Sequence, residues 1–195
     1  MQQKAQGFTL IELLVVIAII AVLAVVVILT LNPAQLLAQA RDSSRISDMS
    51  TFKSAISLFL ADVVAPSSTA IGASSTCYGS AVLTPAGSGC GGRMTAATVA
   101  TTTVALAPGT GGTGWIPINF GLISAGSPIG AEPIDPVNNA TYFYSYATNA
   151  APSYQFEINA NMESTKYANT GGSDVESTDG GGNANIYETG TSLSL

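Results

Sequence analysis

The feature that most constrains this chain is an uninterrupted apolar run near its N-terminus. From Leu13 to Leu31 there is no charge, proline or glycine, and Thr30 is the single polar residue. A helix of about 20 such residues is long enough to cross the hydrocarbon core of a bilayer. Because the run is apolar on every face, it differs from the amphipathic helix of a soluble core. The sequence therefore predicts a membrane-spanning helix.

Two other kinds of segment share part of this pattern. A cleaved secretory signal has a shorter apolar core, although a small-residue cleavage site does follow at residues 38–40. A generic membrane anchor explains the length but not Glu12, which lies inside the apolar segment. A charge costs on the order of 3 kcal/mol at the centre of a membrane-spanning helix and somewhat less near its end. We therefore expect Glu12 to have a partner, and the alternative is an acid that merely suits a helix N-terminus.

The residues in front of Glu12 form a specific motif. Residues 1–7 are a short leader with one cation, Lys4, and they end at Gly7, which Phe8 follows. The run Gly7-Phe-Thr-Leu-Ile-Glu12 resembles the processing and assembly motif of type IV prepilins and type II secretion pseudopilins. The resemblance implies that a prepilin peptidase cuts between Gly7 and Phe8 and methylates the new amine. It also implies that Glu12 contacts the Phe8 amine of a neighbouring subunit in a helical fibre.

Two helical parts follow the leader. Residues 8–32 are the predicted transmembrane and polymerisation helix, and residues 33–64 are a predicted amphipathic stalk helix. Pro33 is expected to bend or locally open the helix between them, and Pro66 to end it. In the second part, apolar residues recur at spacings of three and four, which predicts one buried face: Ile46, Met49, Phe52, Ile56, Phe59, Leu60 and Val63. The charged residues are expected mostly on the other face: Arg41, Asp42, Arg45, Asp48, Lys53 and Asp62.

Residues 65–195 form the predicted head. Alternating side chains predict strands at residues 142–146 and 154–159, joined as a hairpin by residues 147–153. Residues 98–106 are rich in threonine and valine and predict a further strand. The expected fold class is therefore α+β, with the long N-terminal helix packed on a small antiparallel sheet. We expect the tyrosines of the sheet to serve packing and the fibre surface rather than ligand stacking.

The two cysteines, Cys77 and Cys90, flank a loop rich in glycine, serine and alanine. An even number of cysteines in an exported chain predicts one disulfide. Two free thiols would instead suit a cytosolic protein. Because the N-terminus indicates export, we predict the disulfide.

An acidic, glycine-rich stretch lies between residues 171 and 182 and carries Asp174, Glu176 and Asp179. Oxygen-rich loops of this kind can bind calcium. The major pseudopilins that this chain resembles often carry calcium in a C-terminal loop. The spacing does not fit an EF-hand, and a solvated loop without metal is the alternative interpretation.

Composition narrows the function further. Histidine is absent, which removes the commonest general base and metal ligand, and no cofactor-binding loop is recognisable. We therefore expect no enzyme and no cofactor other than calcium. Past residue 64, Arg93 and Lys166 are the only cations beside eight acids, so we expect no nucleic-acid partner for this region.

These features together predict a structural subunit of a type IV pilus or of a secretion pseudopilus. The precursor is expected to lie in the cytoplasmic membrane as a single-pass protein with its N-terminus inside, and later in an extracellular or periplasmic fibre. Its predicted partners are other copies of itself, the prepilin peptidase and the membrane assembly platform. A minor pilin with an adhesive or ligand-binding head is the alternative.

Overall fold

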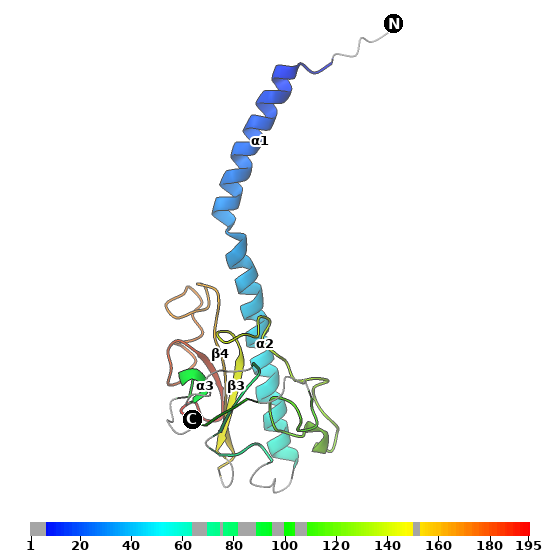
Figure 1. Ribbon diagram of the computed structural model, residues 1–195, viewed down its shortest axis with the longest axis vertical. Helices are drawn as coiled ribbons and strands as arrows, with labels where there is room; N and C mark the ends of the chain where they lie inside the picture. The colour runs from blue at the N-terminus through cyan, green and yellow to red at the C-terminus, as the bar shows by residue number, and fades with distance from the viewer. Residues whose placement is uncertain are drawn as a thin grey trace. The chain divides into compact units, whose positions relative to one another are not determined.

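The computed structural model describes residues 7–63, 70–74, 76–81, 89–94, 100–103, 109–149 and 153–195. The chain divides into two compact units, Met1–Leu37 and Ala38–Leu195. The first unit holds helix α1 and the first residues of helix α2, and the second holds the rest of α2 together with the sheet (Figure 1).

Helix α1 spans Leu10–Leu31. Every side chain of α1 whose placement is described is exposed, and the helix is long and apolar enough to cross a membrane by length and composition. It ends at Asn32, whose left-handed backbone (φ 39°) interrupts the helix before Pro33 begins α2. A proline suits the first position of a helix because the amide hydrogen it lacks would have no partner there. The predicted opening at Pro33 is therefore confirmed.

Helix α2 spans Pro33–Asp62. Its predicted apolar stripe is confirmed, because Met49, Phe52, Ile56 and Phe59 are fully buried. Ile46, Leu60 and Val63 pack against the same core and are partly buried. The helix ends before Pro66, which lies outside the described residues.

Within the described residues, the sheet has five strands in the order β2-β1-β3-β4-β5. Their bounds are β1 Thr76–Gly79, β2 Ala100–Thr103, β3 Tyr144–Asn149, β4 Gln155–Ala160 and β5 Tyr187–Gly190. Four of them, β1, β3, β4 and β5, form the predicted antiparallel sheet, and β2 adds in parallel to β1 at one edge. A short turn α3 (Gly89–Gly92) and a 3-10 turn η1 (Phe120–Leu122) lie in the connections.

Two strand predictions were imprecise at their ends. The strand expected over residues 98–106 is confirmed as β2 at residues 100–103, and the rest of that range lies outside the described residues. The hairpin of β3 and β4 is present, but its strands begin at Tyr144 and Gln155 rather than at residues 142 and 154. Strand β3 also continues to Asn149, so residues 147–149 belong to the strand rather than to the connection. Thr148 and Asn149 extend the strand because they pair with Phe156 and Gln155 of β4.

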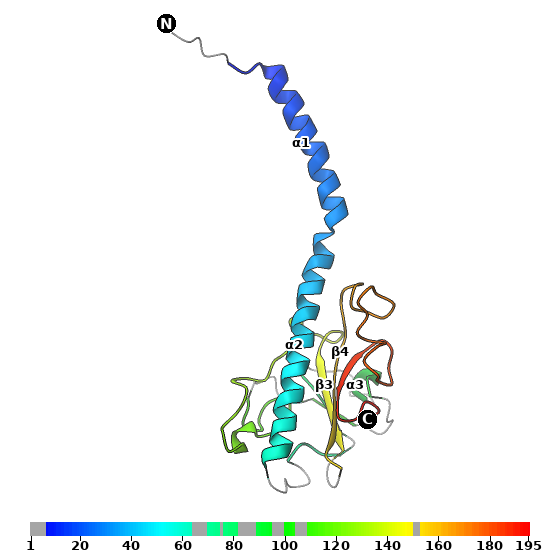
Figure 2. The ribbon, with the colours of Figure 1, turned by 180° about the vertical axis from the view of Figure 1, so that it is seen from behind.

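One face of the sheet packs on α2, which runs beside β3 and β4 in both views (Figures 1 and 2). Tyr144 and Tyr146 of β3 are fully buried there, which confirms that these tyrosines serve packing. The Phe52 ring of α2 meets Tyr144 edge to face at 6.4 Å and Trp115 at 5.2 Å. Edge-to-face pairs place the positive ring edge against the negative ring face, which stabilises the contact beyond the area that it buries.

The opposite face of the sheet is also covered. Cys77, Ala147, Phe143 and Leu195 form a second apolar cluster on that side. Alternate residues of β4, Glu157 and Asn159, are fully buried there although they are polar. The sheet therefore lies between two packed layers, one apolar and one mixed.

Candidate functional site

The predicted processing junction lies outside any helix. Gly7 and Phe8 are exposed, Phe8 by 85% of its surface, and α1 begins only at Leu10. A side chain at position 7 would meet no atom within 4 Å, and the Gly7 backbone is not in the left-handed region. The fold therefore does not require glycine at position 7, so any requirement for it must come from another molecule that recognises this segment.

Glu12 forms a capping box with Thr9 at the start of α1. The Thr9 hydroxyl oxygen accepts the Glu12 backbone N–H at 3.3 Å. In return, Glu12 Oε2 accepts the Thr9 backbone N–H at 2.8 Å and the Thr9 hydroxyl hydrogen at 2.7 Å. This reciprocal arrangement satisfies two backbone donors that a helix start leaves without partners. Glu12 therefore caps the start of α1 within a single chain.

The capping box leaves part of the Glu12 carboxylate available. Both accepted hydrogen bonds use Oε2, and Oε1 accepts none from the described residues. The backbone donor is the Thr9 amide, not the Phe8 nitrogen. Removal of residues 1–7 would therefore leave the cap intact, and Glu12 could cap its own helix while it accepts a further donor.

Helix α2 carries a buried ion cluster, which corrects the prediction for its charged face. Asp42 and Arg45 were expected away from the packed side, but both are fully buried. The Arg45 guanidinium donates to both carboxylate oxygens of Asp135, from Nε at 2.7 Å and from Nη2 at 2.9 Å. Its Nη1 donates to Asp42 at 2.7 Å and to Glu163 at 3.3 Å. We call Asp42, Arg45, Asp135 and Glu163 the ion cluster.

The ion cluster ties α2 to two distant segments of the head. Asp42 also accepts the backbone N–H groups of Glu163 at 2.9 Å and Ser164 at 2.8 Å. Arg41 forms a second ion pair with Glu163. Burial alone would lower the pKa of Arg45, but the hydrogen bonds and charges of Asp135 and Asp42 raise it well above its ordinary value. The positive charge of Arg45 is therefore compensated by carboxylates, and we interpret the ion cluster as the contact that holds α2 to the rest of the head.

The predicted disulfide is present between Cys77 and Cys90. It joins β1 to the turn α3, and both cysteines are fully buried in the second apolar cluster beside Met94 and Phe143. The two cysteines are 13 residues apart in sequence. The bridge therefore anchors the turn α3 to β1 on the sheet face opposite α2.

Replacing both cysteines with alanine is expected to reduce the free energy of unfolding by about 3 kcal/mol. The chain-entropy model gives this value for a loop of this size, because the unfolded chain regains the freedom that the bridge removes. Denaturant unfolding of the full chain in detergent measures the loss. In the native protein, alkylation should add two labels only after reduction, as read by intact mass. Two labels without reductant would mean that the bridge does not form.

The three predicted calcium ligands serve three separate turns. Asp174 accepts the backbone N–H groups of residues 170, 176 and 177. Glu176 is buried and accepts the N–H of Met162 at 2.8 Å and that of Asn169 at 2.9 Å. Asp179 accepts the N–H groups of Gly181 and Glu188. In the part of the chain that the structure describes, no group of three or more acidic or cysteine side chains is placed to hold a metal. Calcium binding by these three acids stays a prediction.

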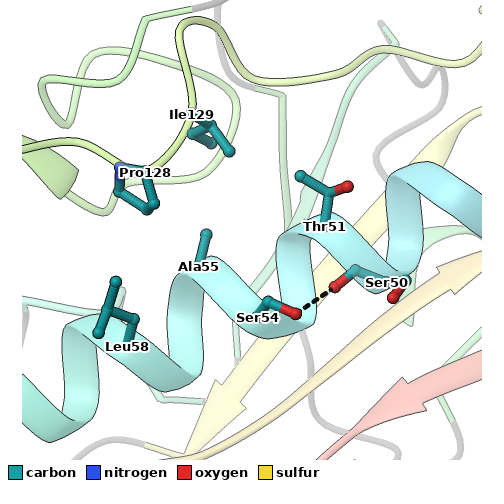
Figure 3. A pocket seen from close by; sticks show the side chains of 7 residues that line it. All are labelled: Ser50, Thr51, Ser54, Ala55, Leu58, Pro128 and Ile129. Carbon is teal, nitrogen blue, oxygen red and sulfur yellow. Dashed lines mark hydrogen bonds between the residues drawn. The ribbon is translucent and has the colours of Figure 1, made fainter.

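A depression of about 290 Å³ lies on the surface of α2 (Figure 3). Its walls are Ser50, Thr51, Ser54, Ala55 and Leu58 of the helix together with Pro128 and Ile129. The hydroxyl of Ser54 donates to the Ser50 carbonyl at 2.9 Å, and that of Thr51 donates to the Ser47 carbonyl at 2.9 Å. These hydroxyls are engaged within the helix and no charged side chain lines the depression, so it lacks the groups that catalysis needs.

Comparison with known proteins identifies the N-terminal region. Residues 2–28 match the family model described as the prokaryotic N-terminal methylation motif, which is the motif of type IV prepilins and pseudopilins. The match includes the Gly7–Phe8 junction, Glu12 and most of α1. No curated protein and no solved structure matches the chain. Proteins of this kind are typically non-enzymatic and structural, and the motif implies processing by a prepilin peptidase and assembly into pili.

Proposed function

We propose that this type IV pilin-like chain is a structural subunit of a pilus or pseudopilus fibre. It is stored in the cytoplasmic membrane, loses residues 1–7, and polymerises through α1. The observation that carries the proposal is a methylation motif that runs into helix α1, which is apolar and exposed on every described face. Such a helix needs either lipid or other apolar helices around it, because a large exposed apolar surface is unfavourable in water.

Helix α1 suits both environments. Its length and composition allow it to cross a bilayer, and lipid would cover the whole apolar surface. In a fibre, copies of α1 would replace the lipid. Ala18, Ala21 and Ala24 are small residues three apart on this helix, and small residues let helices approach closely where van der Waals packing drives association.

Glu12 would give the assembly its register. Cleavage after Gly7 creates a positively charged amine on Phe8, and opposite charges attract strongly where the dielectric constant is low. Glu12 Oε1 accepts no hydrogen bond from the described residues, so it can receive this amine from a neighbouring subunit while Oε2 keeps the helix cap. An axial stagger between subunits that brings the two groups together would then be favoured over other staggers.

The features of the head favour an exported structural protein over an enzyme. Its disulfide is typical of proteins that function outside the reducing cytoplasm. The ion cluster and the two packed faces of the sheet make it a rigid body on α2. Such a head would decorate the surface of a fibre whose centre is built from α1.

Processing is the first test of this function. Fibres sheared from cells and purified should yield an N-terminal peptide that starts at Phe8 and is heavier by one methyl group. Mass spectrometry of the digested fibre measures both properties. Mature protein that begins at Met1, or at Arg41 after a cut at Ala40, would overturn the proposal.

Gly7→Leu provides a matched control for the processing test. The space around position 7 is open, so we expect this variant to fold and insert as the wild type does. We also expect it to remain uncut, because the requirement for glycine lies in the peptidase. Cutting of the variant at the wild-type rate would show that glycine is not what the peptidase recognises.

A further inference from the structure

Four polar side chains are buried together on the sheet face opposite α2. Ser145 of β3 lies opposite Asn159 of β4, and Asn159 lies opposite Glu188 of β5. Residues directly opposite in an antiparallel pair share one face with their Cβ atoms about 5 Å apart. Glu157 lies two residues from Asn159 on the same strand and therefore on the same face. We call Ser145, Glu157, Asn159 and Glu188 the oxygen cluster; their exposed fractions are 0%, 0%, 0% and 2%.

Each member of the oxygen cluster has one oxygen without a hydrogen-bond donor among the described residues. These atoms are Ser145 Oγ, Glu157 Oε1, Asn159 Oδ1 and Glu188 Oε1. The second carboxylate oxygens do have donors, since Glu157 Oε2 accepts the Leu195 N–H at 2.8 Å and Glu188 Oε2 accepts the Asn183 N–H at 3.0 Å. Buried polar atoms nearly always have a partner, so four orphaned oxygens on one patch indicate an ion or a solvent molecule bound there.

The charges of the cluster also need compensation. The Glu157 and Glu188 carboxyl groups lie in direct contact, and the Glu157 carboxyl also contacts the Asn159 amide. Neither carboxyl forms an ion pair with a described lysine or arginine. Two carboxylates in contact repel each other in a low-dielectric site unless a cation or a proton lies between them.

We propose that the oxygen cluster binds one hard divalent cation of the calcium class between β4 and β5. A double positive charge balances the two carboxylates. A single proton shared between the two carboxyl groups would provide a partner for one oxygen of Glu157 and one of Glu188. It would still leave Asn159 Oδ1 and Ser145 Oγ without a partner among the described residues. The cation would complete all four orphaned oxygens at once.

The donor set favours calcium over other metals. Four carboxylate oxygens, one amide oxygen and one hydroxyl oxygen are hard ligands, and calcium takes six to eight oxygens in a flexible geometry. Magnesium retains several waters and demands a regular octahedron, which a fully buried site suits poorly. Because Glu188 also accepts from Asn183 and donates its N–H to Asp179, the cation would hold the segment before β5 onto the sheet.

The test uses the full chain purified in detergent at pH 8, where both carboxyls can ionise. Calcium titrated calorimetrically into chelator-treated protein should bind with one-to-one stoichiometry, and the thermal midpoint should rise with calcium because a ligand specific to the folded state stabilises it. Glu188→Gln keeps the shape but removes one charged ligand, so it should weaken calcium binding at least tenfold. Asp174→Asn changes the acidic loop instead and should bind as the wild type does.

The remaining outcomes overturn the proposal. Wild type that binds no calcium at pH 8, but melts at a higher temperature as the pH falls below about 7, would assign the carboxyl pair to a shared proton. Calcium binding that Asp174→Asn removes and Glu188→Gln preserves would assign the ion to the acidic loop. If Glu188→Gln does not fold, Ser145→Ala decides, because it removes one neutral ligand and must weaken calcium binding several-fold.

Discussion

Replacing Glu12 with leucine is expected to reduce fibre yield almost to zero, while the chain still enters the membrane and is still cut after Gly7. Leucine suits lipid better than a carboxylate does, so insertion should not suffer. Assembly should fail because the Phe8 amine of the neighbouring subunit loses its counter-charge in an apolar setting. Glu12→Asp should give an intermediate yield, because its carboxylate reaches less far. The measurement is the ratio of sheared fibre to membrane-bound subunit, with each variant expressed as the only pilin.

The capping box makes Glu12→Gln the decisive control. Glutamine can still accept the Thr9 N–H and can complete a capping box, but it carries no charge. If Glu12 acts by pairing with the amine, Glu12→Gln should assemble almost as poorly as Glu12→Leu. If instead Glu12→Gln builds fibres at the wild-type yield while Glu12→Leu does not, the cap is what assembly requires and the pairing mechanism is wrong.

Replacing Arg45 with methionine should destabilise the head by about 3–5 kcal/mol, the usual loss when one partner of a buried ion pair is removed. Methionine fills much of the volume but leaves Asp42 and Asp135, both fully buried, without their cation. Glu163 would keep Arg41 as a partner. The free energy of unfolding of the full chain in detergent, taken from denaturant titration, measures the effect.

Two further variants define what the Arg45 result means. Lys53→Met removes a cation from the exposed side of the same helix, and it should change stability by no more than about 0.5 kcal/mol. Arg45→Lys retains the charge but cannot bind both oxygens of Asp135 as the guanidinium does, so it should fall between wild type and Arg45→Met. Equal losses for Arg45→Met and Lys53→Met would mean that the ion cluster does not fasten α2 to the head.

The features that sequence reasoning predicted correctly depend on neighbours in the chain. The apolar run of α1 and the break at Pro33 are properties of consecutive residues. The buried stripe of α2 follows from the helical repeat of 3.6 residues, and the hairpin of β3 and β4 from the alternation of side chains along a strand. The methylation motif is likewise a run of consecutive residues.

The features that sequence reasoning missed depend on partners far apart in the chain. Arg45 was predicted on the exposed face of the helix, because no neighbouring residue in the sequence indicates its contacts with Asp135, 90 residues away, and Glu163, 118 residues away. Only the packed fold brings three carboxylates to one guanidinium, and only complete pairing makes burial of these charges tolerable.

The polar side of the sheet shows the same division. The alternation in β4 identified which residues share a face, but not what would cover the face of Glu157 and Asn159. In the tertiary structure β5 pairs with β4, which buries Glu157 against Glu188, and Cys90, Met94 and Leu195 pack on that side of the sheet. Conversely, Asp174, Glu176 and Asp179 are close in sequence, yet each turns to a different set of backbone N–H groups. The period of a helix or strand decides to which face a side chain points, whereas the surroundings of that side chain depend on contacts between residues far apart in the sequence.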